Sequence, residues 1–459
     1  MFSMPQDILS GRQVLVIGFG RQGQALARWL PMVGARVIVN DMRDQDTLKL
    51  QPSDWPRVQF VLGSHPEILL RGTDLICVSG GVPLDLPLIE KAREQKIAVT
   101  NDAQLFMERC PAPVIGITGS AGKTTTTTLV GEMCKVAGLT TWVGGNIGKV
   151  LLDLMVGIRP DHQVVMELSS FQLELMHTSP AVAAVLNITP NHLDRHGTME
   201  AYMRAKAHIL AFQAAGQRAV LSWDDPGSRS LETVAQGDLL WFSMREMVPD
   251  GAFMVGQRLA VAGMASPDGS PHIICEVDDL TLRGDHNLLN VLAACAIAGA
   301  AGISPEAMTE AITNFKPVPH RLETIREING VTYVNDSIAT APERVLAALK
   351  SYEEPIVLLA GGADKKLPWD EMVALALYKS RHIIAFGKDG DIVVETAKKL
   401  TGNTKSVTRV ETLEDAVMEA GQHAQAGDVV LLSPGGTSYD AYIDFADRGD
   451  HFRQLVMAL

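Results

Sequence analysis

Residues 113–125 of this 459-residue chain join an apolar segment to a glycine-rich turn, a lysine and a run of threonines. This pattern predicts a buried strand that ends in a tight turn and leads into a helix. Backbone N–H groups of such a turn point at phosphate oxygens, while Lys123 adds a cation and the Thr124 hydroxyl can hold Mg²⁺. Gly119 and Gly122 let the backbone approach the anion without an intervening Cβ. We therefore predict a triphosphate-binding loop.

The loop is shorter than the general phosphate-binding pattern. Ile117 stands where that pattern has a glycine five residues before Gly122, which leaves the form TGSAGKT at 118–124. The alternative interpretation is an ordinary strand-to-helix turn rich in small residues. The lysine, the hydroxyls and the preceding strand favour the phosphate loop.

Length and charge narrow the class of protein further. A chain of 459 residues exceeds what one hydrophobic core holds, so about three domains are expected. The sequence has neither an apolar run near the roughly 20 residues of a membrane span nor a signal-peptide pattern, so we predict a cytoplasmic protein without a membrane span. Five cysteines without a C-x-x-C pair fit reduced thiols. The net charge of −13 argues against general nucleic-acid binding, and Lys123, Arg321 and Lys365 are candidates for a locally basic site for anions.

Hydrophobic periodicity divides the chain into three α/β parts. Parallel strands are predicted at 14–17, 37–40 and 75–78 with a helix at 24–33, then from 114 and at 164–167, 184–188 and 219–222, and finally at 332–335, 356–360, 383–386 and 429–432. The prolines within residues 316–321 mark a linker. We assign residues 1–109 to an N-terminal Rossmann-like domain, 110–317 to a central ATPase-like domain with the phosphate loop, and 318–459 to a C-terminal Rossmann-like domain.

The first domain carries a glycine motif of its own. The segment GFGRQG at 18–23 lies between a predicted strand and a predicted helix, and Asp41 closes the next strand. This spacing is typical of a dinucleotide fingerprint, in which a diphosphate sits on the helix N-terminus. The pattern does not tell NAD from another nucleotide, and a tight turn without a ligand is an alternative.

Polar residues of the central part follow two predicted strands. Glu167 ends one strand, and a second strand leads into NITPNHLD at 187–194, which brings His192 and Asp194 to the same sheet edge. Glu167 could merely cap a turn and His192 could be structural, but their place beside a phosphate loop favours Mg²⁺ binding by Glu167 and a functional role for both. Lys206 lies among apolar residues of the next predicted helix, where it either snorkels or is buried with a partner or a lowered pKa.

Together these motifs resemble those of the Mur ligases, ATP-dependent enzymes that build the peptide of bacterial peptidoglycan. The resemblance covers essentially the whole chain and rests on TGSAGKT at 118–124, GGNIG at 144–148, ELSSFQL at 167–173, NITPNHLD at 187–194, GDHNLLN at 284–290, HR at 320–321, NDS at 335–337, SPGGTS at 433–438 and RG at 448–449. It implies a ligase that adds D-glutamate to UDP-N-acetylmuramoyl-L-alanine through an acyl phosphate, with ATP and two Mg²⁺ ions. We expect a monomer.

The resemblance also implies roles for individual residues. ATP would be bound by Gly119, Ser120, Ala121, Gly122, Lys123, Thr124, Thr125, Asn287, Asn290, Arg321 and Asp336. The UDP substrate, rather than NAD, would be bound by Gly18, Phe19, Gly20, Arg21, Gln22, Asp41, Arg43, Ser79, Gly80, Asn146 and Gln172. Glutamate would be bound by Thr340, Lys365, Ser433 and Tyr439. Lys123, Glu167, His192 and Lys206 would be catalytic; Thr124 and Glu167 would hold one Mg²⁺, and His192 with a carbamylated Lys206 the second.

Three departures from the family pattern fall in the third domain. Ile338 stands where a lysine is common, Gly435 and Gly436 replace an Ala-Cys pair, and Tyr439 lies close to the place of a common aspartate or phenylalanine. They leave open a related ligase that adds L-glutamate to the same nucleotide.

Other classes make distinct predictions. A folylpolyglutamate-synthase-like ligase shares the short loop but would not need the motif at 18–23. A silent nucleotide sensor would lack Glu167, His192 and Lys206 as a set. A nicotinamide oxidoreductase would change the absorbance of NAD(P)H.

Overall fold

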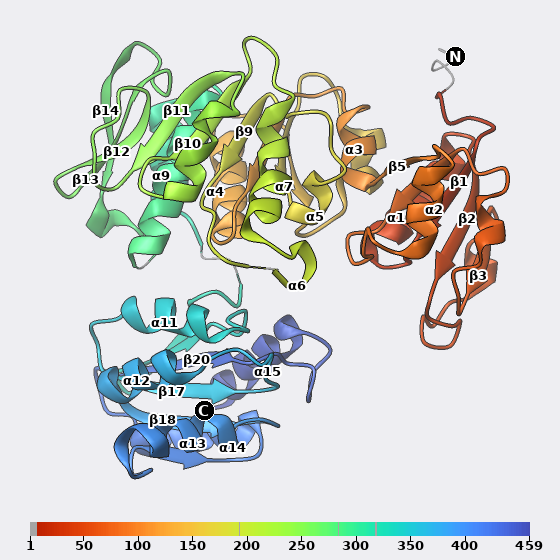
Figure 1. The fold of residues 1–459 in the computed structure, drawn as a ribbon. Coiled ribbons are helices and arrows are strands. Elements are labelled where there is room, and N and C mark those ends of the chain that lie inside the picture. The colour runs from red at the N-terminus through yellow and green to blue at the C-terminus, as the bar shows by residue number, and fades with distance from the viewer. Residues whose placement is uncertain (1–6, 192, 283, 317–318) are drawn as a thin grey trace. The chain divides into compact units, whose positions relative to one another are not determined.

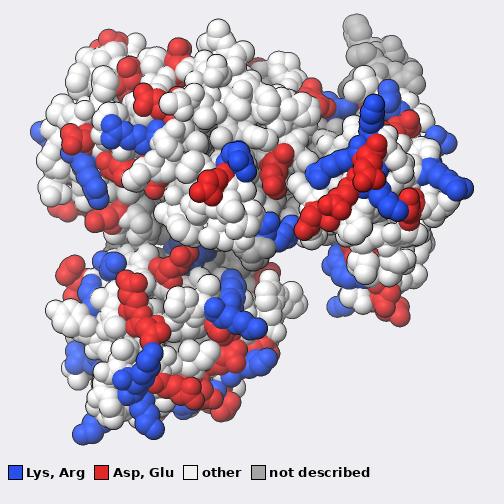
Figure 2. All heavy atoms as spheres, in the orientation of Figure 1, with Lys and Arg blue, Asp and Glu red and all other residues white. Residues whose placement is uncertain are grey.

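The computed structural model describes residues 7–191, 193–282, 284–316 and 319–459, which contain three sheets (Figure 1). The chain forms two compact units, one of Met1–Asp279 with Leu289–Asn314 and the other of Leu280–Leu288 with Phe315–Leu459. None of the described helices is long and apolar enough to cross a membrane. Figure 2 shows basic and acidic side chains interspersed on the visible face.

The first sheet is parallel and has the order β3-β2-β1-β4-β5. Its strands are β1 (Gln13–Ile17), β2 (Arg36–Asp41), β3 (Val58–Leu62), β4 (Leu75–Val78) and β5 (Ala98–Thr100), with 3-10 turns at Pro52–Asp54 and Glu67–Leu70. Helices α1 (Arg21–Met32) and α3 (Asp102–Met107) cover one face and α2 (Pro87–Glu94) the other, because alternate residues of β1 join different apolar clusters. The predicted Rossmann-like fold is confirmed.

Helix α1 begins three residues before the predicted start at Gln24. Gly20 is extended and serves as the N-cap, so the helix starts at Arg21, directly after the glycine turn. A Cβ on Gly23 would lie 1.9 Å from the carbonyl oxygen of Gly18, so this first helical turn packs directly against the end of β1. The helix ends at Met32, and the predicted last residue, Val33, is its C-cap.

The second sheet has the order β14-β13-β12-β11-β10-β9-β6-β8-β7. Its strands are β6 (Val114–Thr118), β7 (Thr141–Gly145), β8 (Gln163–Glu167), β9 (Val182–Val185), β10 (Arg218–Ser222), β11 (Asp238–Ser243), β12 (Gly251–Val255), β13 (Arg258–Gly263) and β14 (Gly269–Glu276). The strands from β7 to β12 pair in parallel, whereas β12, β13 and β14 form an antiparallel extension.

The helices around this sheet are α4 (Lys123–Val136), α5 (Ser170–Leu173), α6 (Leu193–His196), α7 (Met199–Ala211), α8 (Pro226–Arg229), α9 (Asp285–Ala300) and α10 (Pro305–Thr313), with 3-10 turns at Leu151–Gly157, Ser230–Thr233 and Val277–Asp279. Strand β9 ends at Val185, so the predicted strand at 184–188 was placed too late in the chain. Beyond β9, Leu186 still donates its N–H to the Thr118 carbonyl, but Asn187 already hydrogen-bonds Ala121 of the glycine loop.

The third sheet has the order β15-β16-β20-β17-β18-β19, parallel except for the β15–β16 pair. Its strands are β15 (Glu323–Ile328), β16 (Val331–Asn335), β17 (Ile356–Gly361), β18 (Ser380–Phe386), β19 (Val407–Arg409) and β20 (Val429–Gly435). One face packs against α11 (Pro342–Lys350), α12 (Asp370–Lys379) and α13 (Asp391–Thr401), the other against α14 (Leu413–His423) and α15 (Phe445–Ala458). The predicted α/β organisation is confirmed here as well.

Candidate active site

The glycine loop predicted from the sequence connects β6 to α4. Gly122 is the N-cap of α4 and has a left-handed backbone with φ of +81°. A Cβ at this position would lie 2.1 Å from the Oδ1 atom of Asn290 in α9, so both the conformation and the space require glycine. Lys123 begins the helix, and its Nζ donates back to the Gly119 carbonyl over 2.9 Å.

Two neighbouring segments hold the loop in place. The amide of Asn187 accepts from the Ala121 N–H over 2.8 Å and donates to the Ala121 carbonyl over 3.2 Å. The Ser120 hydroxyl donates to the carbonyl of Thr189 over 3.0 Å and lies 3.0 Å from the hydroxyl of Tyr202 in α7. The loop is thus fixed by side chains that the sequence analysis had not singled out, although Asn187 lay in a quoted motif.

Glu167, the last residue of β8, faces the start of α4. Its Oε2 atom accepts from the Thr124 hydroxyl over 2.9 Å, and its Oε1 atom accepts from Asn146 Nδ2 over 2.9 Å. The residue is 2% exposed, so the carboxylate is held between two neutral donors in a largely desolvated place. By contrast, the predicted Thr125 side chain is buried, and its hydroxyl has no hydrogen-bond partner among the described residues.

Lys206 lies on α7 and is buried, as one of the two predicted alternatives required. Its Nζ donates to the Gly119 carbonyl over 2.9 Å and to the Thr118 hydroxyl over 3.3 Å. Burial, together with the positive charge of Lys123, lowers the pKa of Lys206 well below its usual value, although Glu167 opposes the shift. The neutral amine is thus more accessible here than it is for a lysine in water.

These residues differ in their fitness for Mg²⁺. The Thr124 hydroxyl and the Glu167 carboxylate are hard oxygen donors that already converge, which suits one ion. The amine of Lys206 is not such a donor unless it is converted into a carbamate. The described residues contain no group of three His, Cys, Asp or Glu side chains placed to bind a metal. His192 lies outside the described residues.

The middle sheet also contacts the predicted UDP-substrate residues of the first sheet. Arg21 donates to the carbonyl of Asn146 over 2.6 Å and to that of Gly148 over 3.0 Å. The same Asn146 donates its side-chain amide to Glu167. Asn146, which is predicted to contact the UDP substrate, therefore connects the start of α1 to the carboxylate beside the glycine loop.

In the first sheet, Asp41 organises the glycine turn. Its carboxylate accepts from the Phe19 N–H over 2.7 Å and from the Arg43 guanidinium over 2.7 and 2.9 Å. Although burial opposes the shift, the hydrogen bonds from Arg43 and Phe19 lower the pKa of Asp41 to about 2. Gly18 has φ of +89°, and the Ser79 side chain packs against it. Asp41 is thus ionised and engaged with the backbone of the fingerprint.

A cavity of about 630 Å³ brings further predicted residues together. Ser79, Gly80 and Gln172 share its wall with Phe171, Arg93 and Arg195. Gln172 forms a capping box with Ser169, and its Nε2 lies 3.4 Å from the carboxylate of Asp102. Burial raises the pKa of Asp102 to about 6. Asp102 was not predicted from the sequence, because an acidic residue at the start of a helix is common.

The second unit carries the predicted residues of the third domain. Asp336 follows β16, and its Oδ2 atom accepts from the hydroxyl of Ser433 in β20 over 2.8 Å. Burial raises the pKa of Asp336 to about 7, while the Ser433 hydrogen bond and the charge of Arg321 oppose that shift. Lys365 donates to the Thr340 hydroxyl over 3.2 Å, which pairs two of the predicted glutamate-binding residues. The side chain of Tyr439 lies in the open, 75% exposed.

Arg448 of α15 joins the segments that hold these residues. Its guanidinium donates to the Ser337 hydroxyl and carbonyl over 3.0 and 2.9 Å, and to the carbonyls of Gly436 and Thr437 over 3.2 and 3.1 Å. The side chain is 1% exposed, and burial lowers its pKa to about 10. The motif that contains Arg448 does not indicate this role, because burial cannot be read from the sequence.

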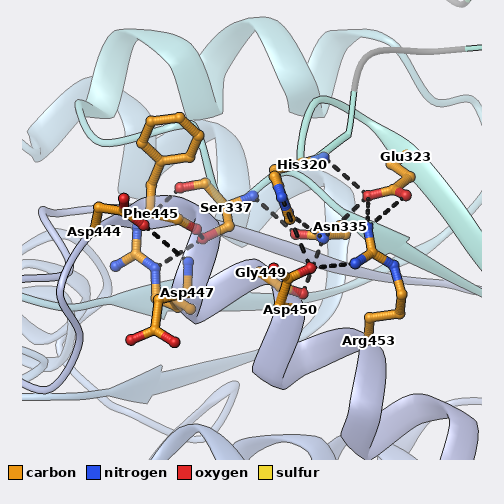
Figure 3. Close-up of polar contacts among 11 residues, drawn as sticks. His320, Glu323, Asn335, Ser337, Asp444, Phe445, Asp447, Gly449, Asp450 and Arg453 are labelled. Atoms are coloured by element: carbon orange, nitrogen blue, oxygen red, sulfur yellow. Dashed lines mark hydrogen bonds and ion pairs between the residues drawn. The ribbon is translucent and has the colours of Figure 1, made fainter. Parts of the chain in front are cut away.

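A second polar cluster, drawn in Figure 3, anchors the end of β16 to α15. The Asn335 amide donates to the Gly449 carbonyl over 3.1 Å and to Glu323 over 3.2 Å. The same amide lies 3.1 Å from His320 Nδ1, and Arg453 donates to Glu323 over 2.7 and 2.9 Å. The cluster fixes the residue immediately before Asp336.

The remaining predicted residues are placed as follows. Asn287 and Asn290 are buried in α9, and Gly20 and Gln22 lie in the turn and first residues of α1. Arg321 belongs to the second unit, where its charge affects the pKa of His286 and of Asp336. The predicted sites thus fall into two groups, one in each unit.

The chain matches three protein-family models that together span most of its length. Residues 12–101 match the "Mur ligase MurD-like, N-terminal domain", residues 117–298 the "Mur ligase middle domain", and residues 320–436 the "Mur ligase, glutamate ligase domain".

Full-length relatives with known names are also similar. Two proteins named UDP-N-acetylmuramoylalanine--D-glutamate ligase are 40% identical, one from Pelotomaculum thermopropionicum (98% of both chains covered) and one from Alkaliphilus oremlandii (98% of this chain, 99% of the relative). A protein of that name from Clostridium botulinum is 38% identical over 100% of this chain and 99% of its own.

Solved structures agree in fold. UDP-N-acetylmuramate-alanine ligase MurC from Thermotoga maritima has a TM-score of 0.60 at 18% identity, covering 97% of this chain and 99% of its own. MurF ligase from Thermotoga maritima, solved in complex with ADP, has a TM-score of 0.58 at 19% identity. The match covers 98% of this chain and 97% of the MurF chain.

Proposed function

This chain belongs to the Mur ligase family, and from that premise we propose that it joins D-glutamate to UDP-N-acetylmuramoyl-L-alanine in an ATP-dependent step of peptidoglycan synthesis. The observation that carries the proposal is the match to D-glutamate ligases at 38% and 40% identity along the whole chain. The MurD-like match of the N-terminal sheet separates this activity from that of a folylpolyglutamate-synthase-like ligase or an oxidoreductase.

The reaction has two steps. A carboxylate oxygen of the alanyl substrate attacks the γ-phosphorus of ATP, the bond to ADP breaks, and an acyl phosphate forms. The glutamate nitrogen then attacks the acyl carbon, inorganic phosphate leaves with the bonding electrons, and the nitrogen loses a proton. Because negative charge moves over the transferring oxygens, cations and fixed N–H groups stabilise the transition state more than the ground state.

The glycine loop is the proposed place of the ATP phosphates. Lys123 would turn from its own loop carbonyls to the phosphates, while backbone N–H groups of residues 119–125 bind the oxygens. The rigid support of Ala121 by Asn187 and of Ser120 by Thr189 favours this use, because a preformed loop loses little entropy on binding. Asn287, Asn290, Arg321 and Asp336 are the further proposed nucleotide contacts.

Two Mg²⁺ ions would act beside the phosphates, where they neutralise charge when bound. Thr124 and Glu167 would hold one. A carbamate on Lys206 would hold the other with His192, and it would form when the neutral amine attacks the carbon of CO₂ and releases a proton. The lowered pKa of Lys206 supports that assignment, because the unprotonated amine is the nucleophile.

Each unit is proposed to contain substrate-binding residues. Gly18 to Gln22, Asp41, Arg43, Ser79, Gly80, Asn146 and Gln172 would bind the UDP substrate, and Thr340, Lys365, Ser433 and Tyr439 would bind glutamate. We also propose domain boundaries at 109/110 and 317/318, a cytoplasmic location and a monomer.

The test is release of phosphate from ATP with UDP-N-acetylmuramoyl-L-alanine and either D- or L-glutamate, with Lys206→Ala beside the wild type. Release that requires D-glutamate and is lost in the variant supports the proposal. Release with L-glutamate would transfer the chain to the related ligase class, and no release with either would overturn the assignment.

A further inference from the structure

Three cations of the second unit surround the segment 336–340. Arg344, on the first turn of α11, reaches back so that its Nη1 donates to the Ile338 carbonyl over 3.3 Å. Lys365 donates to the Thr340 hydroxyl over 3.2 Å. Arg448 donates to the Ser337 carbonyl over 2.9 Å. One short segment therefore collects three positive side chains.

These cations are bound to neutral oxygens rather than to carboxylates. Among the described residues, no Asp or Glu oxygen lies within 4.0 Å of the charged nitrogens of Arg344, Lys365 or Arg448. In the same unit Arg381 and Arg453 do have carboxylate partners, at 2.6 and 2.7 Å. In an acidic chain, cations gathered without counter-ions mark a place for an anionic ligand.

The three differ in what they can offer a ligand. Arg448 is 1% exposed and spreads its donors over four protein oxygens. Arg344 is exposed, and its Nε and Nη2 have no hydrogen-bond partner in the part of the chain that the structure describes. Desolvation and the positive charges of Arg344 and Arg448 lower the pKa of Lys365, whereas the charge of Glu343 opposes this shift. The three cations are therefore close enough to repel one another. A carboxylate between Arg344 and Lys365 would relieve that repulsion.

We propose that Arg344 determines specificity for a dicarboxylic amino acid by binding one carboxylate of the incoming glutamate, at the segment where Lys365 meets Thr340. The inference rests on the proposed function and adds a residue to it. A guanidinium presents two parallel N–H donors that match a carboxylate, so Arg344 recognises charge and shape together. Ile338 contributes a carbonyl that orients the guanidinium and no charge of its own.

The test compares Arg344→Gln and Arg344→Lys with Lys350→Gln, which removes an exposed cation from the last turn of the same helix. Steady-state kinetics give KM separately for D-glutamate, ATP and the UDP substrate. For Arg344→Gln we expect KM for D-glutamate to rise at least about tenfold with KM for ATP unchanged, because a charge-assisted hydrogen bond is lost. For Arg344→Lys we expect a KM for D-glutamate between those of the wild type and Arg344→Gln. For Lys350→Gln we expect the wild-type KM.

A second readout separates recognition from damage to the fold. The preference for D-glutamate over D-glutamine should fall in Arg344→Gln, since the neutral side-chain amide of glutamine does not need the cation. An unchanged preference, or equal rises in KM for D-glutamate and ATP, would overturn the inference while the proposed function stands. A wild-type enzyme inactive with every glutamate substrate would overturn both.

Discussion

The Thr124 hydroxyl lies 2.9 Å from one carboxylate oxygen of Glu167, whose other oxygen is held at 2.9 Å by Asn146. A residue at the end of β8 is thereby aimed at the first turn of α4. The Asn146 carbonyl also accepts from Arg21 of α1, so the carboxylate is oriented both by the start of α4 and, through Asn146, by a residue that contacts α1. Thr124 and Glu167 would hold the Mg²⁺ ion proposed above, because both offer hard oxygen donors.

Glu167→Gln should reduce kcat by about 10²–10³-fold, because the amide loses the charge that holds a cation beside the phosphates. The fold should persist, since the amide oxygen can still accept a hydrogen bond. Steady-state phosphate release at several Mg²⁺ concentrations checks this, with Glu132→Gln on the exposed face of α4 as the control. Equal activity of the two variants would contradict the role of Glu167.

Gly122→Ala should abolish nucleotide binding and lower stability, because a Cβ would meet Asn290 Oδ1 at 2.1 Å. The matched control is Gly138→Ala, where φ is +84°, close to the +81° of Gly122, but nothing lies within 4 Å of the added Cβ. The control should show the conformational cost alone, about 1–2 kcal/mol. Thermal unfolding and ATP titration measure both variants. Similar behaviour of the pair would mean that the contact with Asn290 does not matter.

Lys206→Met should be more stable than the wild type in CO₂-depleted buffer at neutral pH. The pKa of Lys206 is lowered on folding, so between that value and the unfolded value near 10.5 the unfolded chain binds a proton that the folded chain lacks. Wild-type stability therefore rises with pH through this window, and the advantage of the variant should shrink. Urea unfolding at pH 7 and pH 9.5 measures the difference. A stability difference between the variant and the wild type that stays constant or widens with pH would contradict the lowered pKa of Lys206.

Asp336→Asn should gain stability relative to the wild type as the pH rises. The folded Asp336 has a pKa of about 7 against 3.8 in the unfolded chain, so the folded state binds the extra proton between these values. Its contribution is complete below about pH 4 and is lost as the pH rises through 7, whereas asparagine does not titrate. Melting temperatures of both proteins at pH 5 and pH 8 provide the test. Parallel pH profiles would show that Asp336 is not protonated in the fold.

Sequence predicted the parallel strands best where both faces of a strand are buried. The strands ending at Ile17, Val78 and Glu167 were found because their apolar runs are continuous. The end of the edge strand β7 was interpreted as part of a glycine motif, and the strands β12 to β14 were not predicted. Short strands that contain polar and glycine residues lack a continuous apolar run.

The sequence predicted those candidate site residues that stand out by their type or by their position at the end of a strand. Glu167 and Lys206 were singled out because a carboxylate at a strand end and a lysine among apolar neighbours are unusual in sequence. Asp102 gave no such signal, since an acidic residue in a first helical turn is ordinary. Arg344 gave none because it lies outside the recognised motifs. The role of Asp102 depends on burial and on Gln172, which is distant in sequence, and that of Arg344 depends on the nearby charge of Lys365; only the folded chain reveals these neighbours.

Strand β20 lies between β16 and β17, although it is the last strand of the chain to be made. While the ribosome is still adding residues 336–428, β15 with β16 and β17 with β18 and β19 have no strand to join them. Each piece then exposes an unpaired edge, which is prone to association with other chains. The sheet of the second unit can therefore close only after β20 has been made, because β20 is the strand that pairs with both β16 and β17.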